Sequence, residues 1–145
     1  MTQYKQSGII LIRWIGTILQ ILLLKDPTTR KWELPYGGKK RIDGNKPFKT
    51  MKREFFEECG FELPWLTSLE SFKVYNGKSI TYKAFFKSNN RYLTQENSWK
   101  LHHKGKEHTE ARWVSVSDIN LTKQCFFGGQ LRGRTVMSLK YSGLF

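Results

Sequence analysis

The strongest constraint on the fold is a nearly uninterrupted apolar stretch close to the start of the chain, GIILIRWIGTILQILLL. A signal peptide or a membrane span is disfavoured, because Arg13 and Gln20 interrupt the stretch and no small-residue cleavage site follows it. Ile and Leu dominate without strict alternation, which is typical of strands buried on both faces. We therefore expect two strands, at residues 7–12 and 17–25, joined by a turn near Gly16 in a sheet covered on both sides.

A helix is predicted at residues 47–59, after a loop rich in glycine. Asn45 is a candidate N-cap, Pro47 suits the first turn, and Gly60 stands where a left-handed C-terminal cap is expected. Apolar residues recur at spacings of three and four, which predicts one buried stripe. The stripe is formed by Phe48, Met51, Phe55 and Cys59.

The remaining pattern completes a single α/β domain over residues 1–145. Residues 70–88 predict a hairpin around Asn76–Gly77, and residues 89–106 read as a long, basic loop. A strand at 110–116, a short helix and a last helix at about 130–141 follow. No linker or repeat divides the chain, so we expect one domain with a mixed sheet.

The charge balance favours polyanionic partners. Lys and Arg number 25 against 12 Asp and Glu, a net charge of +13. Nucleic acid, nucleotides and an anionic membrane surface all fit this charge, although we expect no membrane role. The two cysteines, Cys59 and Cys125, lie far apart and in no metal-ligand spacing, which favours free thiols in a reducing, cytoplasmic compartment.

Three acids gather on the predicted helix in the sequence REFFEECG. Glu54, Glu57 and Glu58 stand at i, i+3 and i+4, so their carboxylates share one patch, and Arg53 can pair with Glu57. An ordinary solvated acidic helix face is one interpretation. The other is a site for Mg²⁺ or Mn²⁺, which prefer such oxygen ligands, with the preceding loop bringing Lys39 to a bound phosphate.

The segment LPYGGKKRIDGN…REFFEECGF resembles the Nudix box. The pattern of that family is Gly, five residues, Glu, seven residues, then Arg-Glu-aliphatic-any-Glu-Glu-any-Gly-aliphatic. The match from Arg53 to Phe61 is complete apart from Phe at the two aliphatic positions. The stretches GIILI…ILQILLLKD…KWELP and EARWVSVSDI extend the similarity over most of the chain. The resemblance implies the Nudix α/β/α sandwich with a mixed sheet.

The first half of the box departs from the family pattern. Counting back from Arg53, Asn45 stands where the family has Glu, and the loop from Gly38 is one residue longer. Asp43, in the longer loop, is a candidate for the missing acid.

The resemblance also implies an activity and a set of roles. The activity is hydrolysis of a pyrophosphate linkage in a nucleoside diphosphate joined to another group, with Mg²⁺ or Mn²⁺ as cofactor. Glu54, Glu57, Glu58 and the Gly38 carbonyl would bind the metal, and Arg53 would orient a glutamate. The general base is expected after the box.

For that base, Glu110 is the first candidate and Glu107 the reserve; a surface acid near a strand start is the alternative for both. Lys39 and Lys40 are candidates for phosphate contact. Tyr36 replaces a small residue beside the two glycines, so we expect it to face the pocket and contact the substrate.

The substrate is left open between classes. Capped or 5′-triphosphorylated RNA ranks first, because a long polyanion would use the surplus positive charge at residues 89–106 and in QLRGR. Free nucleotides such as oxidised dGTP, dinucleoside polyphosphates or ADP-ribose rank second. A Nudix-fold RNA-binding module that has lost catalysis is the rival from another class.

Overall fold

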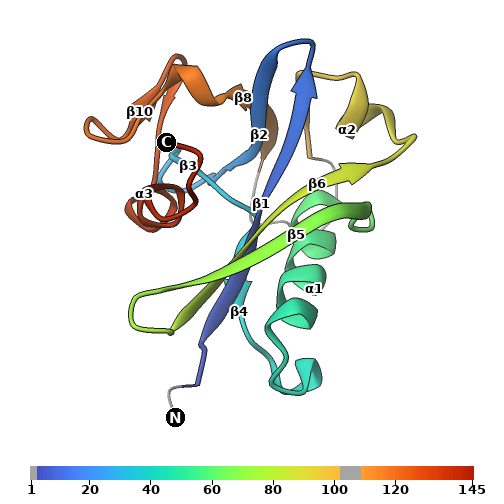
Figure 1. Ribbon diagram of the computed structural model, residues 1–145, viewed down its shortest axis with the longest axis vertical. Helices are drawn as coiled ribbons and strands as arrows, with labels where there is room; N and C mark the ends of the chain where they lie inside the picture. The colour runs from blue at the N-terminus through green and yellow to red at the C-terminus, as the bar shows by residue number, and fades with distance from the viewer. Residues whose placement is uncertain (1–2, 102–108) are drawn as a thin grey trace.

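The computed structural model describes residues 3–101 and 109–145. Over these residues it forms an eight-stranded mixed sheet with helix α1 on one face and helix α3 on the other (Figure 1). This arrangement confirms the predicted α/β/α sandwich. The strands of this sheet are β1 (Gln6–Ile15), β2 (Ile18–Lys25), β3 (Trp32–Glu33), β4 (Tyr36–Gly38), β5 (Trp65–Val74), β6 (Ser79–Lys87), β7 (Ser98–Lys100) and β8 (Glu110–Ser115).

The strand order explains why the sheet is mixed. It runs β5-β6-β1-β2-β8-β7, with β3 paired to β2 and β4 paired to β1. Strand β1 is parallel to β6 and antiparallel to β2 and β4. Gly16, with φ of 60°, lies in the turn between β1 and β2, which confirms the first predicted hairpin.

Alternate residues of β1 supply two separate cores, one on each face. Ile9 packs in a cluster with Met51 and Phe55 of α1, whereas Ile10 packs with Leu139 of α3. All of these side chains are fully buried. The absence of alternation in the sequence therefore correctly predicted a sheet covered on both sides.

Helix α1 spans Pro47–Cys59, the predicted range, and ends at Gly60 in the left-handed conformation with φ of 80°. Its N-cap is Lys46 rather than the predicted Asn45. Asn45 has φ of 59° and continues a left-handed turn begun by Gly44, so the extended conformation required of an N-cap falls one residue later.

Residues 89–101 are more structured than the predicted loop. They contain helix α2 (Arg91–Thr94), where the Asn90 side chain accepts from the amide of Tyr92, and strand β7, which pairs with β8. Leu93 is buried and anchors α2. The rest of that predicted loop, residues 102–106, lies outside the described residues.

The chain ends in a second, smaller sheet and α3. Strands β9 (Ile119–Asn120), β10 (Cys125–Phe126) and β11 (Gly129–Gln130) form the sheet, and α3 spans Gly133–Lys140. Short 3₁₀ helices stand at Arg41–Asp43 and Val116–Asp118. Within the described ranges, every helix is too short or too polar to cross a membrane.

Candidate active site

Strand β4 carries the glycine-rich loop directly over α1. The Tyr36 amide donates to Glu58 Oε1 at 2.9 Å, and a Cβ at Gly37 would overlap the Glu54 carboxylate. Only glycine therefore allows the backbone to approach Glu54 this closely. The loop and the acidic turn of α1 form one packed unit.

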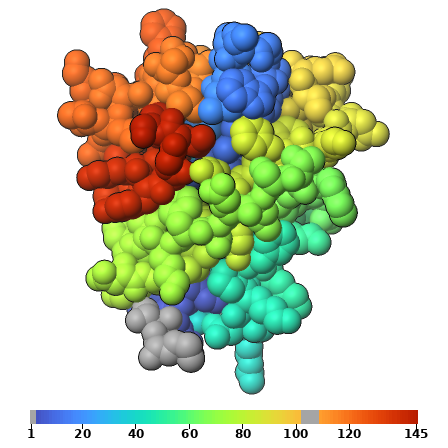
Figure 2. All heavy atoms as spheres, viewed as in Figure 1, coloured from blue at the N-terminus to red at the C-terminus, as the bar shows by residue number. Residues whose placement is uncertain are grey.

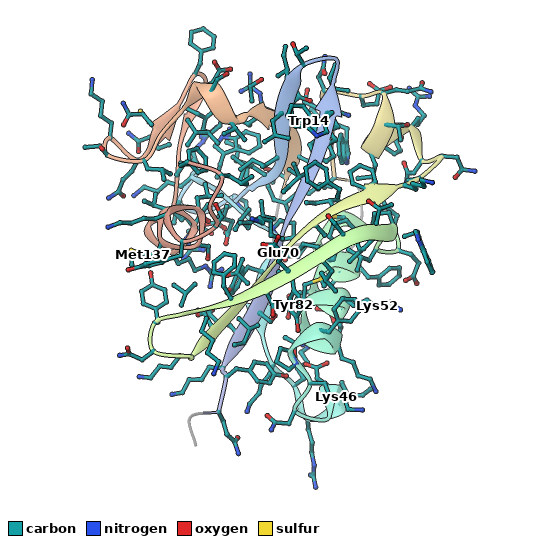
Figure 3. All side chains as sticks on the ribbon, in the orientation of Figure 1. Trp14, Lys46, Lys52, Glu70, Tyr82 and Met137 are labelled. Carbon is teal, nitrogen blue, oxygen red and sulfur yellow. The ribbon has the colours of Figure 1, made fainter. Side chains whose placement is uncertain are left out.

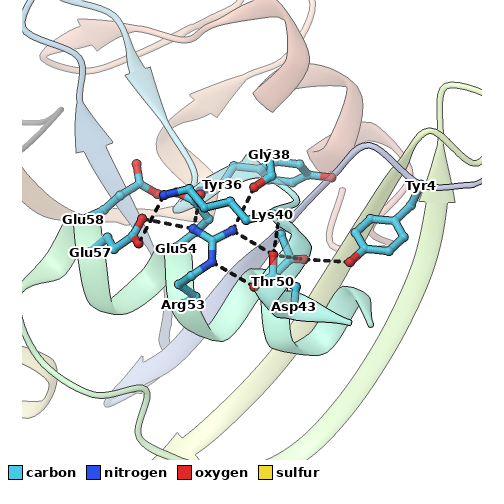
Figure 4. Close-up of polar contacts among 10 residues, drawn as sticks. All are labelled: Tyr4, Tyr36, Gly38, Lys40, Asp43, Thr50, Arg53, Glu54, Glu57 and Glu58. Atoms are coloured by element: carbon cyan, nitrogen blue, oxygen red, sulfur yellow. Dashed lines mark hydrogen bonds and ion pairs between the residues drawn. The ribbon is translucent and has the colours of Figure 1, made fainter. Parts of the chain in front are cut away.

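Arg53 lies at the centre of this unit and binds four groups (Figure 4). Its Nη1 donates to Glu54 Oε1 at 2.9 Å and to Glu57 Oε2 at 3.1 Å. Its Nη2 donates to the Gly38 carbonyl at 2.9 Å. Nε and Nη2 together bind both oxygens of Asp43, at 2.9 and 2.8 Å. We call these residues, together with Glu58, the Arg53 cluster.

Asp43 is the acid that pairs with Arg53 from the lengthened loop. Its carboxylate also accepts from the Lys40 amide and from the Thr50 hydroxyl, each at 2.8 Å, and its side chain is 3% exposed. The hydrogen bonds from Arg53 hold the pKa of Asp43 well below its usual range, and the same bonds raise the pKa of Arg53. Asn45 instead accepts from the Lys39 ammonium.

The three glutamates differ in exposure. Glu57 has 43% of its side chain exposed and lies 3.8 Å from the Lys40 ammonium. Glu54 and Glu58 are buried, at 7% and 2% exposure, because the backbone of β4 covers them. The interpretation as a solvated acidic helix face therefore fits Glu57 and does not fit Glu54 or Glu58.

The donor set has the right chemistry for a hard divalent cation. The guanidinium of Arg53 binds the carboxylates of Asp43, Glu54 and Glu57 and the Gly38 carbonyl, and Mg²⁺ and Mn²⁺ bind such oxygen ligands. However, no three acid, His or Cys side chains of the described residues are positioned to hold a metal together. Arg53 lies between Glu54 and Glu57, so these carboxylates would have to turn toward a shared ion.

A family comparison decides the assignment of this site. The model of the NUDIX domain matches residues 6–131. The chain belongs to the Nudix family. Its domain is that of a pyrophosphohydrolase, and the Arg53 cluster is built from its Nudix box. No curated protein matches this sequence.

Solved structures with the same fold include Nudix proteins of different kinds. A C. elegans Ap4A hydrolase in a binary complex is 22% identical, with a TM-score of 0.55 over 79% of this chain and 82% of that chain. The NUDIX domain of Shewanella oneidensis NrtR, complexed with ADP ribose, is 14% identical, with a TM-score of 0.60 over 98% and 87%. A NUDIX hydrolase from Nitrosomonas europaea is 15% identical, with a TM-score of 0.56 over 96% and 87%. At these identities the likeness concerns the fold alone.

Tyr36 lies in the core, whereas it was expected to face the pocket of this Nudix loop. Its ring is 5% exposed in the core on the α3 side, and its hydroxyl lies 2.9 Å from the Thr81 hydroxyl. Gly8 on the neighbouring strand makes this possible, because a Cβ there would overlap the ring. Burial raises the pKa of Tyr36, as expected for a phenol of the core.

The two loop lysines have different surroundings. The Lys39 ammonium donates to Gln3 and Asn45 and lies 4.9 Å from the centre of the Tyr4 ring. Lys40 is largely exposed, and its ammonium lies 3.8 Å from Glu57 of the box. Of the two, Lys40 lies closer to the expected metal ligands, and both phosphate roles stay predictions.

Strand pairing fixes the position of Glu110, the first candidate for the general base. Glu110 begins β8 opposite Lys25 and Lys100, and the alternation of the strand puts it on the face opposite to Ala111, which packs on the α1 side. The role of Glu110 as general base stays a prediction. Glu107 lies outside the described residues.

Sequence reasoning missed two supports of the cluster, Thr50 and Tyr4. The Tyr4 hydroxyl lies 2.7 Å from the Thr50 hydroxyl, which in turn binds Asp43. A polar Thr one position before the apolar Met51 of the stripe was the available signal for Thr50. Tyr4, in contrast, is 46 residues away in the chain, and no local pattern predicts its contact.

Proposed function

We propose that this Nudix domain is a Mg²⁺- or Mn²⁺-dependent hydrolase of a nucleoside diphosphate joined to another group, with capped or 5′-triphosphorylated RNA as its first substrate class. The observation that supports the proposal best is the Arg53 cluster, in which Arg53 binds Glu54, Glu57 and the Gly38 carbonyl, while Glu58 accepts from the Tyr36 amide of the loop. The net charge of +13 supports RNA over a free nucleotide.

In this proposal, the residues of the Arg53 cluster and Glu110 have different roles. Glu54, Glu57 and Glu58 would hold the cation, and Arg53 orients the first two through its hydrogen bonds. Asp43 holds Arg53 in place from the other side. When bound, the cation screens the pyrophosphate charge and makes water more acidic. Glu110 is the proposed acceptor of the proton from the attacking water, with Glu107 as the alternative.

A small-nucleotide substrate is the second candidate. The C. elegans Ap4A hydrolase and the ADP-ribose complex of NrtR share the fold of this chain. Such substrates need only the Arg53 cluster and a local pocket, so they make no use of charge elsewhere on the surface. Oxidised dGTP, dinucleoside polyphosphates and ADP-ribose belong to this class.

A nucleic-acid-binding module without catalysis is the rival from another class. NrtR has also been solved with a 27mer DNA, as a structural neighbour that is 15% identical to this chain. The three box glutamates and Arg53 are all retained in the present sequence, which argues against a loss of chemistry.

The test is a hydrolysis screen in Mg²⁺ and in Mn²⁺, with chelator controls. Capped RNA, triphosphorylated RNA, Ap4A, oxidised dGTP and ADP-ribose are compared by kcat/KM for the wild type, Glu57→Gln and Glu62→Gln. Glu62 is an exposed acid just beyond the helix and serves as the matched control.

We expect turnover of RNA 5′ ends that is lost in Glu57→Gln and kept in Glu62→Gln. A higher kcat/KM for a small nucleotide would move the second candidate to first place. RNA binding without hydrolysis of any of these substrates would support the noncatalytic rival.

A further inference from the structure

One end of the molecule collects positive charge from three separate segments. The 39–46 loop with the start of α1, the N-terminal part of β1 and the β5–β6 hairpin meet there (Figure 2). We define the basic end by six exposed cations on these segments, Lys5, Arg41, Lys46, Lys49, Lys73 and Lys78. Lys46, which precedes α1, is labelled at this end of the molecule in Figure 3.

The backbone joins these segments directly. The Lys39 amide donates to the Lys5 carbonyl at 2.9 Å, and the Lys5 amide donates to the Lys78 carbonyl at 2.7 Å. The loop, strand β1 and the hairpin therefore hold their side chains in a fixed relation to one another. The positive charge belongs to one surface rather than to three independent ones.

The charge of this end is not neutralised by local acids. Residues 3–8 and 71–82 contain no Asp or Glu, and Asp43 is the only acid in residues 35–53. Asp43 is buried and bound by Arg53. Among the described residues, no acid forms an ion pair with any of the six cations.

The other basic stretches differ in this respect. Arg132 and Arg134 bind the buried Glu33 at 3.0 and 2.7 Å, and Arg91 binds Glu96 at 2.5 Å. These arginines were expected to line a path for RNA, yet their charge is already engaged. Lys104 and Lys106 of the same expectation lie outside the described residues.

The basic end adjoins the Arg53 cluster through Gly38. A hollow of about 570 Å³ is lined by Lys5, Lys78, Tyr75 and Gly38, and the Gly38 carbonyl also accepts from Arg53. Two lysines and a tyrosine that is 43% exposed thus stand beside an expected metal ligand. Such a mixture of cations and an aromatic ring suits a phosphate chain with a base stacked on the ring.

A second hollow, of about 400 Å³, continues from the first. It is lined by Asn45 and Pro47 at the start of α1 and by Lys73 and Asn76 of the hairpin. Asn76 lines both hollows, so together they lead from Gly38 toward the start of the helix. Ile42 of the 39–46 loop is 81% exposed and offers an apolar surface to a bound ligand.

We propose that the basic end binds the chain of a single-stranded RNA whose 5′ phosphates lie at the Arg53 cluster; this inference rests on the proposed function. The surface is cationic and polar, and its exposed apolar side chains, Tyr75 and Ile42, are isolated from each other. Amphipathic elements that insert into a membrane have a continuous apolar face instead, so a membrane fits this surface less well than RNA does. The first hollow reaches Gly38 of the Arg53 cluster. This favours a polyanion that is covalently attached to the reacting phosphates, as the chain of an RNA is.

The test measures binding of a 5′-triphosphorylated RNA of twenty nucleotides without divalent metal, so that no turnover occurs. The double variant Lys46→Glu, Lys49→Glu is compared with the wild type and with Lys31→Glu, Lys123→Glu. All four lysines are exposed, and the control pair lies outside the basic end. Acids at the start of a helix are stabilising, so the first variant should fold.

Each phosphate contact contributes about 0.7 to the slope of log affinity against log salt for a single strand. We expect the basic-end variant to weaken binding about 10- to 30-fold at 0.1 M salt and to lower the slope by about 1.4, with no change in the control pair. Equal losses of RNA affinity in the two double variants would overturn the proposal, because RNA would then respond to the net charge of the protein and not to the basic end.

Vesicles that contain phosphatidylserine supply the competing outcome. If the basic-end variant loses vesicle binding and keeps RNA affinity, the surface is a membrane surface and the proposal is wrong. The Glu57→Gln variant separates this inference from the proposed function. It should lose hydrolysis and keep the RNA affinity and salt slope. Hydrolysis therefore tests the proposed function, and RNA affinity tests the basic end separately.

Discussion

Two arginine-centred networks in this protein have opposite charge ratios. In the Arg53 cluster, one guanidinium binds the carboxylates of Asp43, Glu54 and Glu57 and one carbonyl. In the second network, Arg132 and Arg134 both bind the single carboxylate of Glu33. Both networks bury acid side chains, and both connect parts of the chain distant in sequence.

The difference shows which network can accept a cation. The Arg53 cluster presents several oxygen donors to one positive group, as a divalent ion requires. The Glu33 network already has two cations for one acid, and it ties β3 to the segment that enters α3. We therefore assign chemistry to the first network and structure to the second.

The largest expected effect comes from the exposed acid of the Arg53 cluster. Glu57→Gln removes a proposed metal ligand and should lower kcat/KM by about 10³-fold, since metal assistance contributes several kcal/mol to the transition state. Far-UV circular dichroism should stay unchanged, because Glu57 is 43% exposed. Undiminished turnover with a native spectrum would contradict the assignment.

The second largest effect is expected at Glu110, an acid that belongs to neither network. Glu110→Gln should lower kcat by about 10²-fold with little change in metal affinity, the signature of a general base. Glu107→Gln is the paired variant. Loss of rate in Glu107→Gln alone would transfer the role, and normal rates in both would place the base within the box.

Asp43→Asn tests whether the lengthened loop serves the box. We expect about a tenfold loss of activity, typical of groups that orient a metal ligand, and about 2 kcal/mol less stability. Because the pKa of Asp43 is lowered in the folded state, its contribution is present above its ordinary pKa of about 4 and is lost as pH falls below it. Denaturant titrations at pH 7 and pH 3 should show a smaller pH effect in the variant than in the wild type.

The smallest expected effect on activity belongs to the Glu33 network. Glu33→Gln should cost about 2 kcal/mol of stability, because a buried charged partner of two arginines is lost. The kcat of the folded variant should match that of the wild type within about twofold. A large loss of kcat in a folded Glu33→Gln protein would show that the two networks are not separate in function.

Local patterns were sufficient for helix α1 and for the buried strands β1 and β2. Helix α1 follows from its apolar spacing, Pro47 and Gly60, and the buried strands follow from the Ile- and Leu-rich stretch. The N-cap was wrong by one residue, because the left-handed conformation of Asn45 depends on the turn that brings Asp43 to Arg53.

Tertiary contacts decided the rest of the site. Tyr36 was expected at a pocket, yet its ring fills space left by Gly8, which is 28 positions earlier and adjacent only through the pairing of β1 with β4. The box glutamates were predicted from the motif, but their unequal burial results from the backbone of β4 lying over α1. Neither the contact of Tyr36 with Gly8 nor the position of β4 over α1 can be derived from the spacing of residues in the sequence.

The most direct test of the account is divalent metal binding without substrate. Mn²⁺ affinity, measured by electron paramagnetic resonance, is compared for the wild type, Glu57→Gln and Glu33→Gln. The account predicts equal affinity for the wild type and Glu33→Gln, and at least about a tenfold loss in Glu57→Gln. Wild-type Mn²⁺ affinity in Glu57→Gln, together with a loss in folded Glu33→Gln, would contradict the assignment of chemistry to the Arg53 cluster.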